Sequence, residues 1–136
     1  MKVEINNRTK SKINLALAKR ILDQFARTKK ISGNKEISLA FVGDAEIKKI
    51  NKIYRGLDKA TDVLAFGGDN KWLGEIIIDY QQIKRQAGRF GHTPEREMAF
   101  ILVHGLLHLI GLNDKTERDR LKMIKLGEEF IIKNNL

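Results

Sequence analysis

The sequence predicts an α+β fold, in which strands and helices are mixed along the chain and a zincin-like core helix carries a His-x-x-x-His pair. Three observations lead to this prediction. Segments that alternate apolar and polar residues are interspersed with segments of helical periodicity. Two of the strand-like segments flank a glycine-rich turn. The most apolar stretch, Ala99 to Leu112, has the length of a buried helix and is shorter than a membrane span of about 20 residues.

The first half of the chain contains two predicted strands with a helix between them. Lys2 to Asn6 and residues 36–42 have the two-residue period of half-buried strands. The helix between them presents one apolar face, made of Ile13, Leu17, Ile21 and Phe25. A second helix is expected to begin at a capping Asp44 and to end near Arg55-Gly56, with Ile47, Ile50 and Tyr54 on its inner side.

The middle of the chain predicts a hairpin. Thr61 to Phe66 and Trp72 to Asp79 are expected to be strands, and the turn between them is Gly67-Gly68-Asp69-Asn70. A short helix is expected around Gln81 to Gln86, and Gly88 and Gly91 indicate a loop after it.

The boundaries of the histidine-bearing helix are well marked. Thr93-Pro94-Glu95 combines a hydroxyl cap, a proline at the first helical position and a carboxylate in the first turn. Gly111 can take the left-handed conformation that ends a helix. A last helix is expected to begin at Thr116.

The spacing of two histidines predicts a metal site. His104 and His108 share one helical face, with Cβ atoms about 5 to 6 Å apart. Gly111 and Asp114 follow His104 at the offsets of the glycine and third ligand in the zincin pattern H-E-x-x-H-x-x-G-x-x-H. We therefore expect His104, His108 and Asp114 to bind a metal. The chain has no cysteine, which excludes thiolate ligands.

Other interpretations of these residues remain open. The histidines could be core residues bonded to backbone carbonyls, but burying two unpartnered imidazoles would cost about 1–3 kcal/mol each, which favours the metal. Asp114 could be a turn residue or a cap. Gly105 stands where a zinc protease has its glutamate base, which argues against peptide hydrolysis. Helical rise puts His92 about 16 to 18 Å from His104, so we expect a loop residue there.

The charge of the chain favours an anionic partner. Lys and Arg number 26 against 17 Asp and Glu, a formal charge of +9, and nucleic acid is the commonest large anion. A lysine-rich solvated surface is the alternative. Around Arg55 the lysines outnumber the carboxylates, which makes this segment a candidate phosphate-binding flank. Its candidate RNA-binding residues are Arg55, Lys48, Lys52 and Lys59. Tyr54 and Trp72 could stack on unpaired bases, although each is more often a core residue.

Residues 104–114, HGLLHLIGLND, resemble the signature H-G-x-L-H-L-x-G-Y-D-H of the YbeY family of bacterial ribosomal-RNA maturation factors. The matching residues are His104, Gly105, Leu107, His108, Leu109 and Gly111. Leu112, Asn113 and Asp114 stand in place of the family's tyrosine, aspartate and third histidine. Upstream, Asn51, Tyr54-Arg55-Gly56 and Thr61 to Phe66 are similar to the family's asparagine, Y-R-G and T-D-V-L-S-F, with Ala65 in place of serine.

This resemblance implies a small α+β fold with a mixed sheet, a metal held by the central helix and an arginine facing the cleft. It also implies a metal-dependent single-strand endoribonuclease that acts in ribosomal RNA maturation and ribosome quality control. The expected partners are ribosomal RNA precursor and proteins of the small ribosomal subunit, with no membrane involved. We expect a monomer that forms one domain over residues 1–136, and a cytoplasmic one, since the N-terminus lacks the apolar core of a signal peptide.

The chemistry of the expected site agrees with this interpretation. Three protein ligands leave a fourth position open on Zn²⁺, one ion per chain, and such a zinc lowers the pKa of water to about 7. Arg55 would hold the scissile phosphate, so the expected catalytic residues are Arg55, His104 and His108. For Arg55 the alternative is a helix-end arginine that bonds terminal carbonyls. Two alternative functions are a non-catalytic RNA-binding ribosome assembly factor with a weakened metal site and a metalloprotease-like hydrolase. Two histidines and a carboxylate can also hold non-haem iron.

Overall fold

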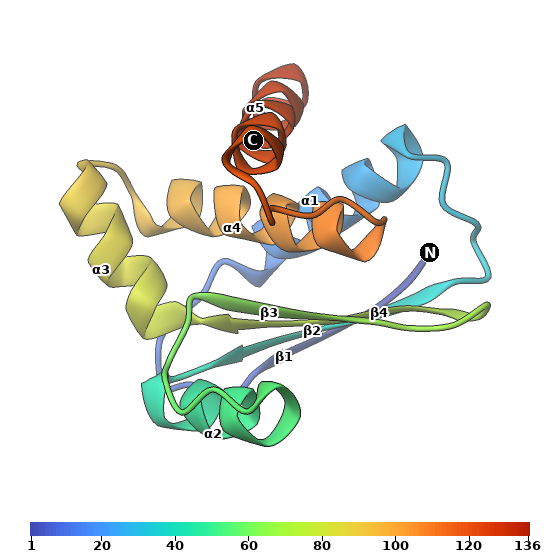
Figure 1. Ribbon diagram of the computed structural model, residues 1–136. Helices are drawn as coiled ribbons and strands as arrows, with labels where there is room; N and C mark the ends of the chain where they lie inside the picture. The colour runs from blue at the N-terminus through green and yellow to red at the C-terminus, as the bar shows by residue number, and fades with distance from the viewer.

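The computed structural model describes all 136 residues and contains one four-stranded sheet with five helices (Figure 1). The strands are β1 (Lys2–Asn7), β2 (Glu36–Val42), β3 (Val63–Gly67) and β4 (Trp72–Asp79). Their order in the sheet is β1-β2-β4-β3; β1, β2 and β4 are parallel, and β3 is an antiparallel edge strand. The expected mixed sheet and the expected hairpin are therefore confirmed.

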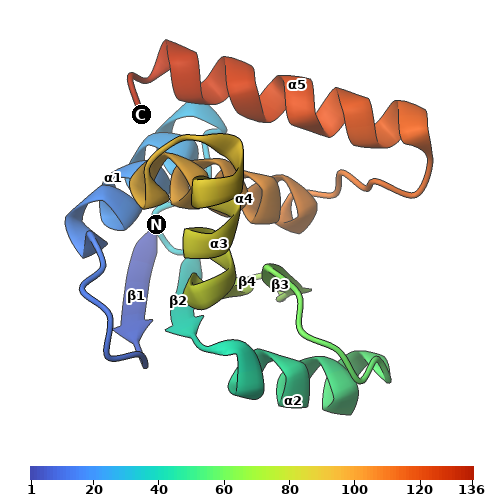
Figure 2. The same cartoon turned by 90° about the vertical axis from the view of Figure 1, so that its left-hand side faces the viewer.

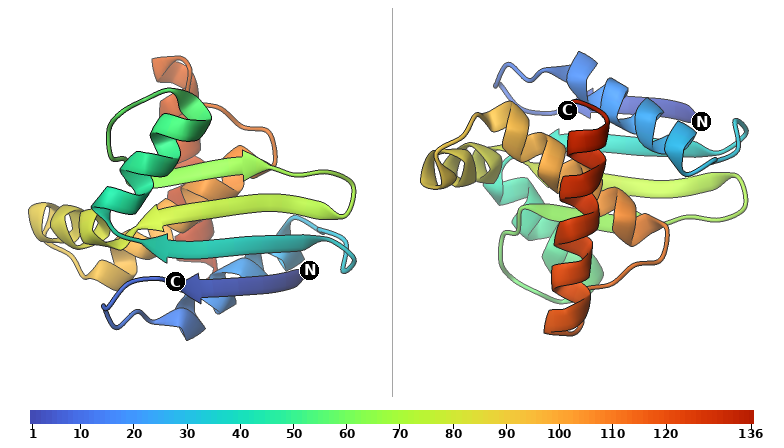
Figure 3. Two further views of the ribbon diagram at one scale, coloured as in Figure 1. Left: turned by 90° about the horizontal axis from the view of Figure 1, so that it is seen from below. Right: turned by 90° about the horizontal axis from the view of Figure 1, so that it is seen from above.

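The helices cover the sheet unequally. They are α1 (Leu15–Thr28), α2 (Asp44–Arg55), α3 (Tyr80–Phe90), α4 (Pro94–Leu109) and α5 (Glu117–Lys133). Only α2 lies on one face, whereas α1 and α4 lie on the other and α5 crosses over α4 (Figure 3). The helix α4 is thus enclosed between the sheet and α5. None of the five helices has both the length and the apolar character needed to cross a membrane.

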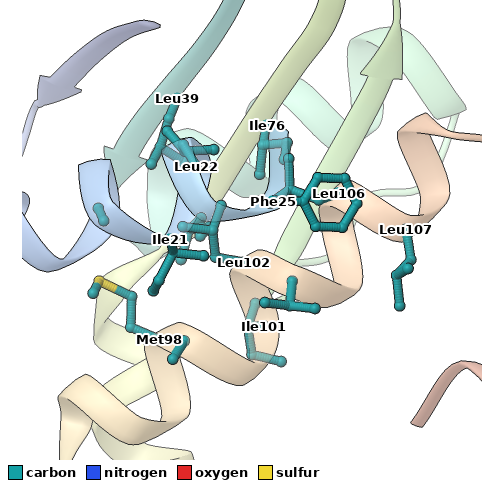
Figure 4. Close-up of a cluster of buried hydrophobic side chains, with 14 of the residues drawn as sticks. Ile21, Leu22, Phe25, Leu39, Ile76, Met98, Ile101, Leu102, Leu106 and Leu107 are labelled. Atoms are coloured by element: carbon teal, nitrogen blue, oxygen red, sulfur yellow. The ribbon is translucent and has the colours of Figure 1, made fainter. Parts of the chain in front are cut away.

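Two cores of unequal size result from this arrangement. The main core has 20 buried residues and lies between the sheet and the helices α1, α4 and α5 (Figure 4). Every labelled side chain from α4 in Figure 4 belongs to this core, which explains the nearly continuous apolar sequence of that helix. A second core beneath α2 has only four buried residues, Val42, Ile47, Leu64 and Ile77.

Three local predictions differ from the structure. The N-cap of α2 is Gly43, and Asp44 is the first helical residue; its backbone N–H donates to Gln81 Oε1 at 2.8 Å. The helix α3 begins after the capping residue Asp79, runs through Gly88 to Phe90 and ends at Gly91, whose φ of +70° is the left-handed conformation of a helix end. Tyr54 is 71% exposed and does not lie on the inner side of α2.

Candidate metal centre

The helix α4 positions the two histidines. The Thr93 hydroxyl accepts a hydrogen bond from Arg96 N at 3.2 Å, and Pro94 begins the helix, as the sequence indicates. From there an unbroken helix reaches Leu109. The Nε2 atoms of His104 and His108 lie 3.2 Å apart, and the ring planes are inclined by 81°. Both imidazoles therefore direct the same atom toward one point.

The chain beyond α4 fixes the orientation of His108. Gly111 has a φ of +105°, a left-handed conformation that turns the chain back toward α4. This turn brings the Leu112 carbonyl to 3.1 Å from His108 Nδ1. A proton on Nδ1 donates to that carbonyl, which leaves Nε2 with a free lone pair for a cation. The alternative interpretation, a histidine bonded to a backbone carbonyl, thus holds for Nδ1 of His108, while its Nε2 lies in the cluster.

The same turn brings Asp114 to the histidine pair. Asp114 Oδ2 lies 3.8 Å from His104 Nε2 and 3.7 Å from His108 Nε2. The three candidate ligand atoms all lie within 4.8 Å of one another. Tetrahedral zinc with ligand bonds of about 2.0 to 2.2 Å has neighbouring ligands about 3.4 Å apart. The observed separations therefore fit one such ion.

The protonation state of His104 also suits metal binding. Burial lowers the pKa of the His104 imidazole, and the neighbouring His108 lowers it further, whereas Asp114 and Asp62 oppose the change. A lowered pKa keeps the imidazole neutral at pH 7, and the neutral form is the one that binds a metal. Asp62, just before β3, is a residue near the site that the sequence analysis did not single out, although it belongs to the T-D-V-L segment.

Gly105 faces the sheet and not the cluster. A methyl group at this position would lie 3.3 Å from Ile76 Cγ2 and 3.4 Å from Val63 Cγ2. The absence of a side chain thus lets α4 pack closely against β3 and β4. A glutamate at residue 105 would enter this apolar contact, so the site has no counterpart of the protease's general base.

The third histidine of the chain lies outside the cluster. His92 is in the loop between α3 and α4, and its Nε2 lies 2.7 Å from Glu97 Oε1. Gln86 Nε2 donates to the other oxygen of this buried carboxylate at 2.8 Å. His92 thus belongs to a contact between the two helices.

Arg55 lies beside the edge strand β3, on the α2 side of the sheet. Its Nη2 donates to the Ala65 carbonyl at 3.0 Å, and its guanidinium lies 5.5 Å from the centre of the Phe66 ring. The helix α4 contacts the same strand from the other face, through Gly105 and Val63. Arg55 and the candidate metal cluster therefore flank one strand, and Arg55 does not bond the terminal carbonyls of its own helix.

The lysines around Arg55 are exposed. Lys48, Lys52 and Lys59 all face solvent. The Lys52 Nζ atom lies 4.0 Å from Asp58 Oδ2. The acidic residues of α2 are neutralised by arginines of other segments. Glu46 pairs with Arg8, and Asp44 pairs through both oxygens with Arg85. The surface of α2 is therefore more basic than its sequence alone indicates.

A buried carboxyl group anchors the start of α2, and the sequence analysis missed it. Asp79 is fully buried, and its Oδ1 accepts hydrogen bonds from Gln81 N and Gln82 N at the start of α3. Its Oδ2 has no donor among the neighbouring groups and is directed at the Asp44 carboxylate. Burial and the Asp44 charge raise the pKa of Asp79 to about 7, whereas Arg85 and Asp79 lower that of Asp44 to about 2. Below pH 7 Asp79 is therefore mostly protonated, and its carboxyl group can donate this proton toward the Asp44 carboxylate.

The fold and the site together define a class of protein. A helix that presents two imidazoles one turn apart, followed by a glycine turn and a carboxylate, matches the residue spacing of the zincin pattern, so this cluster is a candidate metal centre of that class. The glycine at residue 105 sets this example apart from the proteases of that class.

The chain belongs to the YbeY endoribonuclease family. A family model described as "Endoribonuclease YbeY" matches residues 3–135. Two relatives with the same description come from Acholeplasma laidlawii, 44% identical over 79% of this chain and 81% of the relative, and Shouchella clausii, 33% identical over 95% and 92%. The solution structure of a protein from Thermotoga maritima is also similar, with a TM-score of 0.63 and 28% identity over 96% of this chain and 90% of that one.

Proposed function

We propose that this chain is a metal-dependent endoribonuclease that cleaves single-stranded RNA in ribosomal RNA maturation and ribosome quality control. One Zn²⁺ per chain would be held by His104, His108 and Asp114. The observation that carries the proposal is the convergence of two Nε2 atoms and one carboxylate oxygen at separations of 3.2, 3.7 and 3.8 Å, in a member of an endoribonuclease family.

Each residue of the proposed site has its own role around the zinc ion. When bound, zinc supplies Lewis-acid chemistry and lowers the pKa of a water molecule to about 7. His108, fixed by the Leu112 carbonyl, and His104, kept neutral by burial, hold their Nε2 lone pairs ready for the ion. Asp114 supplies a negative charge, which makes the ion less acidic than a third imidazole would. The missing glutamate at residue 105 is then not needed as a base.

Arg55 binds the scissile phosphate in this proposal. A guanidinium has five N–H donors, and Arg55 uses one of them on the Ala65 carbonyl. The others remain for two phosphate oxygens, and they stabilise the charge that builds on those oxygens during cleavage. The RNA-binding residues Lys48, Lys52 and Lys59 then hold neighbouring phosphates.

The wider setting of the activity follows from this substrate. Ribosomal RNA precursor is the proposed partner, together with proteins of the small ribosomal subunit, and such a substrate implies action in the cytoplasm. We propose that residues 1–136 act as one domain and that the protein is a monomer.

A cleavage assay with matched arginine variants tests the proposal. Arg55→Ala should retain the fold and the zinc content but lose most of its activity on single-stranded ribosomal RNA precursor, because it removes a phosphate contact and no ligand. Arg89→Ala is the control, since Arg89 is likewise in the last turn of an exposed helix end, that of α3. His104→Ala should lose both zinc and cleavage. If chelation of the metal left the parent's activity unchanged, the metal-dependent mechanism would be wrong.

A non-catalytic role in ribosome assembly is the second candidate, and the chemistry of Asp114 favours it. A carboxylate that is 45% exposed at the side chain stands where the signature has a histidine, which weakens the ion as a Lewis acid. An assembly factor of this kind would bind RNA equally well with and without metal and would cleave none. The same assay therefore separates the two functions.

A further inference from the structure

The side of the sheet opposite the metal centre carries an open groove. It has a volume of about 980 Å³, lies between α2 and the sheet, and is mainly apolar. Three aromatic side chains line it, Tyr54, Phe66 and Trp72. Tyr54 is 71% exposed and Trp72 is 38% exposed, so neither is the core residue that aromatic side chains usually are.

The three rings are held by different elements. Tyr54 comes from the last turn of α2, Phe66 from the edge strand β3, and Trp72 from the start of β4. The centres of the Tyr54 and Phe66 rings are 5.6 Å apart, and the Arg55 guanidinium lies 5.5 Å from the Phe66 ring. Phe66 therefore supports Tyr54 from behind, while the rest of the Tyr54 ring faces solvent.

The charges around this groove suit the phosphates of a nucleic-acid strand. Lys49 of α2 lines it, and Lys48 and Lys52 lie on the exposed surface of that helix. Glu46 in the lining is neutralised by its ion pair with Arg8. Glu75, on the floor of the groove, is an acceptor that the amino group of a base can use. A strand with its bases turned into the groove and its phosphates toward the lysines meets complementary groups at both positions.

The groove and the metal centre can be reached by one strand. β3 is the edge of the sheet, with α2 on one face and α4 on the other, as Figure 2 shows. Arg55 donates a hydrogen bond to the Ala65 carbonyl of β3. Its guanidinium thus lies at the edge of the sheet, between the groove and the helix α4. An RNA strand that passes around this free edge would therefore meet Tyr54, then Arg55, then the metal ligands.

We propose that Tyr54, supported by Phe66 and with Trp72 in the lining of the same groove, is a stacking platform for unpaired bases of the RNA that the metal centre cleaves. This inference rests on the proposed endoribonuclease function. It gives a physical basis for single-strand preference, because the bases of a duplex have their faces covered by neighbouring bases. Stacking tolerates any base, so the platform selects strandedness and not sequence.

Binding measurements with two kinds of strand test this proposal. The protein with its bound metal is titrated into a fluorescent 2′-O-methyl oligouridine and into an abasic strand of equal length, which has the same phosphates and no bases. Tyr54→Ala should bind the oligouridine about tenfold more weakly than the parent does, and the abasic strand equally well. Tyr54→Phe, which keeps the ring, and Phe90→Ala, which removes another exposed ring, that of Phe90 on α3 with 61% exposure, should both bind the two strands as the parent does.

A spectroscopic signal checks that the contact is stacking. A strand containing 2-aminopurine should lose fluorescence on binding the parent, and it should lose much less on binding Tyr54→Ala. Equal weakening on both strands, or no weakening on either, would overturn the platform, and the second result would point to a protein partner for this groove. If the parent cleaves RNA and Tyr54→Ala binds the oligouridine as tightly as the parent does, the stacking proposal is wrong and the endoribonuclease proposal stands. If the parent neither binds nor cleaves RNA, both proposals are wrong.

Discussion

The substitution Asp79→Asn is expected to stabilise the protein at neutral pH, although it alters a fully buried residue. Below pH 7 Asp79 is expected to hold a proton that it can donate toward Asp44, since burial and the Asp44 charge raise its pKa from 3.8 to about 7. An asparagine amide supplies the same donor at every pH, and its oxygen can still cap α3. The variant therefore retains both contacts without the cost of protonation.

The size of the effect depends on pH in a defined way. A carboxyl group whose pKa is raised by folding holds its proton in the folded state, while the unfolded chain has released it above pH 3.8. The stability of the parent therefore falls by about 1.4 kcal/mol per pH unit as pH rises toward 7, and then levels off. The advantage of Asp79→Asn should grow accordingly, by about 3 kcal/mol between pH 5 and pH 8.

Urea denaturation of both proteins at several pH values measures this difference. The lowered pKa of His104 acts in the opposite direction, destabilising the fold as pH falls below the usual imidazole value of 6.5, but it affects parent and variant equally and cancels. Asp79→Ala is the control, because it loses the cap of α3 and should be about 1 kcal/mol less stable than Asp79→Asn at every pH. A stability difference between parent and Asp79→Asn that does not change with pH would refute the shared proton.

Three further predictions concern the metal helix and the basic surface. Asp114→Ala should lose zinc on dialysis and Asp114→His should keep it, because only the second has three ligands; elemental analysis measures this, and stoichiometric zinc in Asp114→Ala would make Asp114 a turn residue. Gly105→Glu should reduce the free energy of unfolding by about 3 kcal/mol or more, since it buries an unpaired carboxylate against Ile76. A thermal melt like the parent's would contradict that close packing. Lys48→Ala should lower the slope of log affinity for single-stranded RNA against log salt by about 0.7, and an unchanged slope would exclude a phosphate contact there.

The features of α4 were predictable from sequence because they are local. The Thr93 cap, the Gly111 turn and the spacing of His104 and His108 each depend on residues within a few turns of one helix. The cluster with Asp114 follows from the same spacing, since a single tight turn separates the helix from the carboxylate. Short-range geometry of this kind needs no knowledge of the rest of the fold.

Features that depend on the order of the strands were not predictable in this way. The parallel pairing of β2 with β4 sets Val42 beside Asp79, which brings Asp44 against that carboxyl group from 35 residues away in the chain. Tyr54 shares a helical face with Ile47 and Ile50 in the sequence pattern. In the structure α2 buries Ile47 in the small core, and Tyr54 remains exposed. Periodicity identifies a face of a helix, but it does not say how much of that face the sheet covers.

The unequal cores have a consequence for how the two sides of the molecule move. Detaching α2 from the sheet exposes a cluster of four buried residues to solvent, whereas detaching α4 disrupts the packing of a cluster of 20. The free energy of local opening follows the apolar contacts that are lost, so amide protons of α2 should exchange with solvent far sooner than those of α4. The bidentate Asp44–Arg85 pair at one end and the bond from Arg55 to Ala65 at the other tether this helix. The candidate RNA-binding surface on α2 is thus expected to be the more adaptable one, whereas His104 and His108 project from the helix whose amide protons should exchange most slowly.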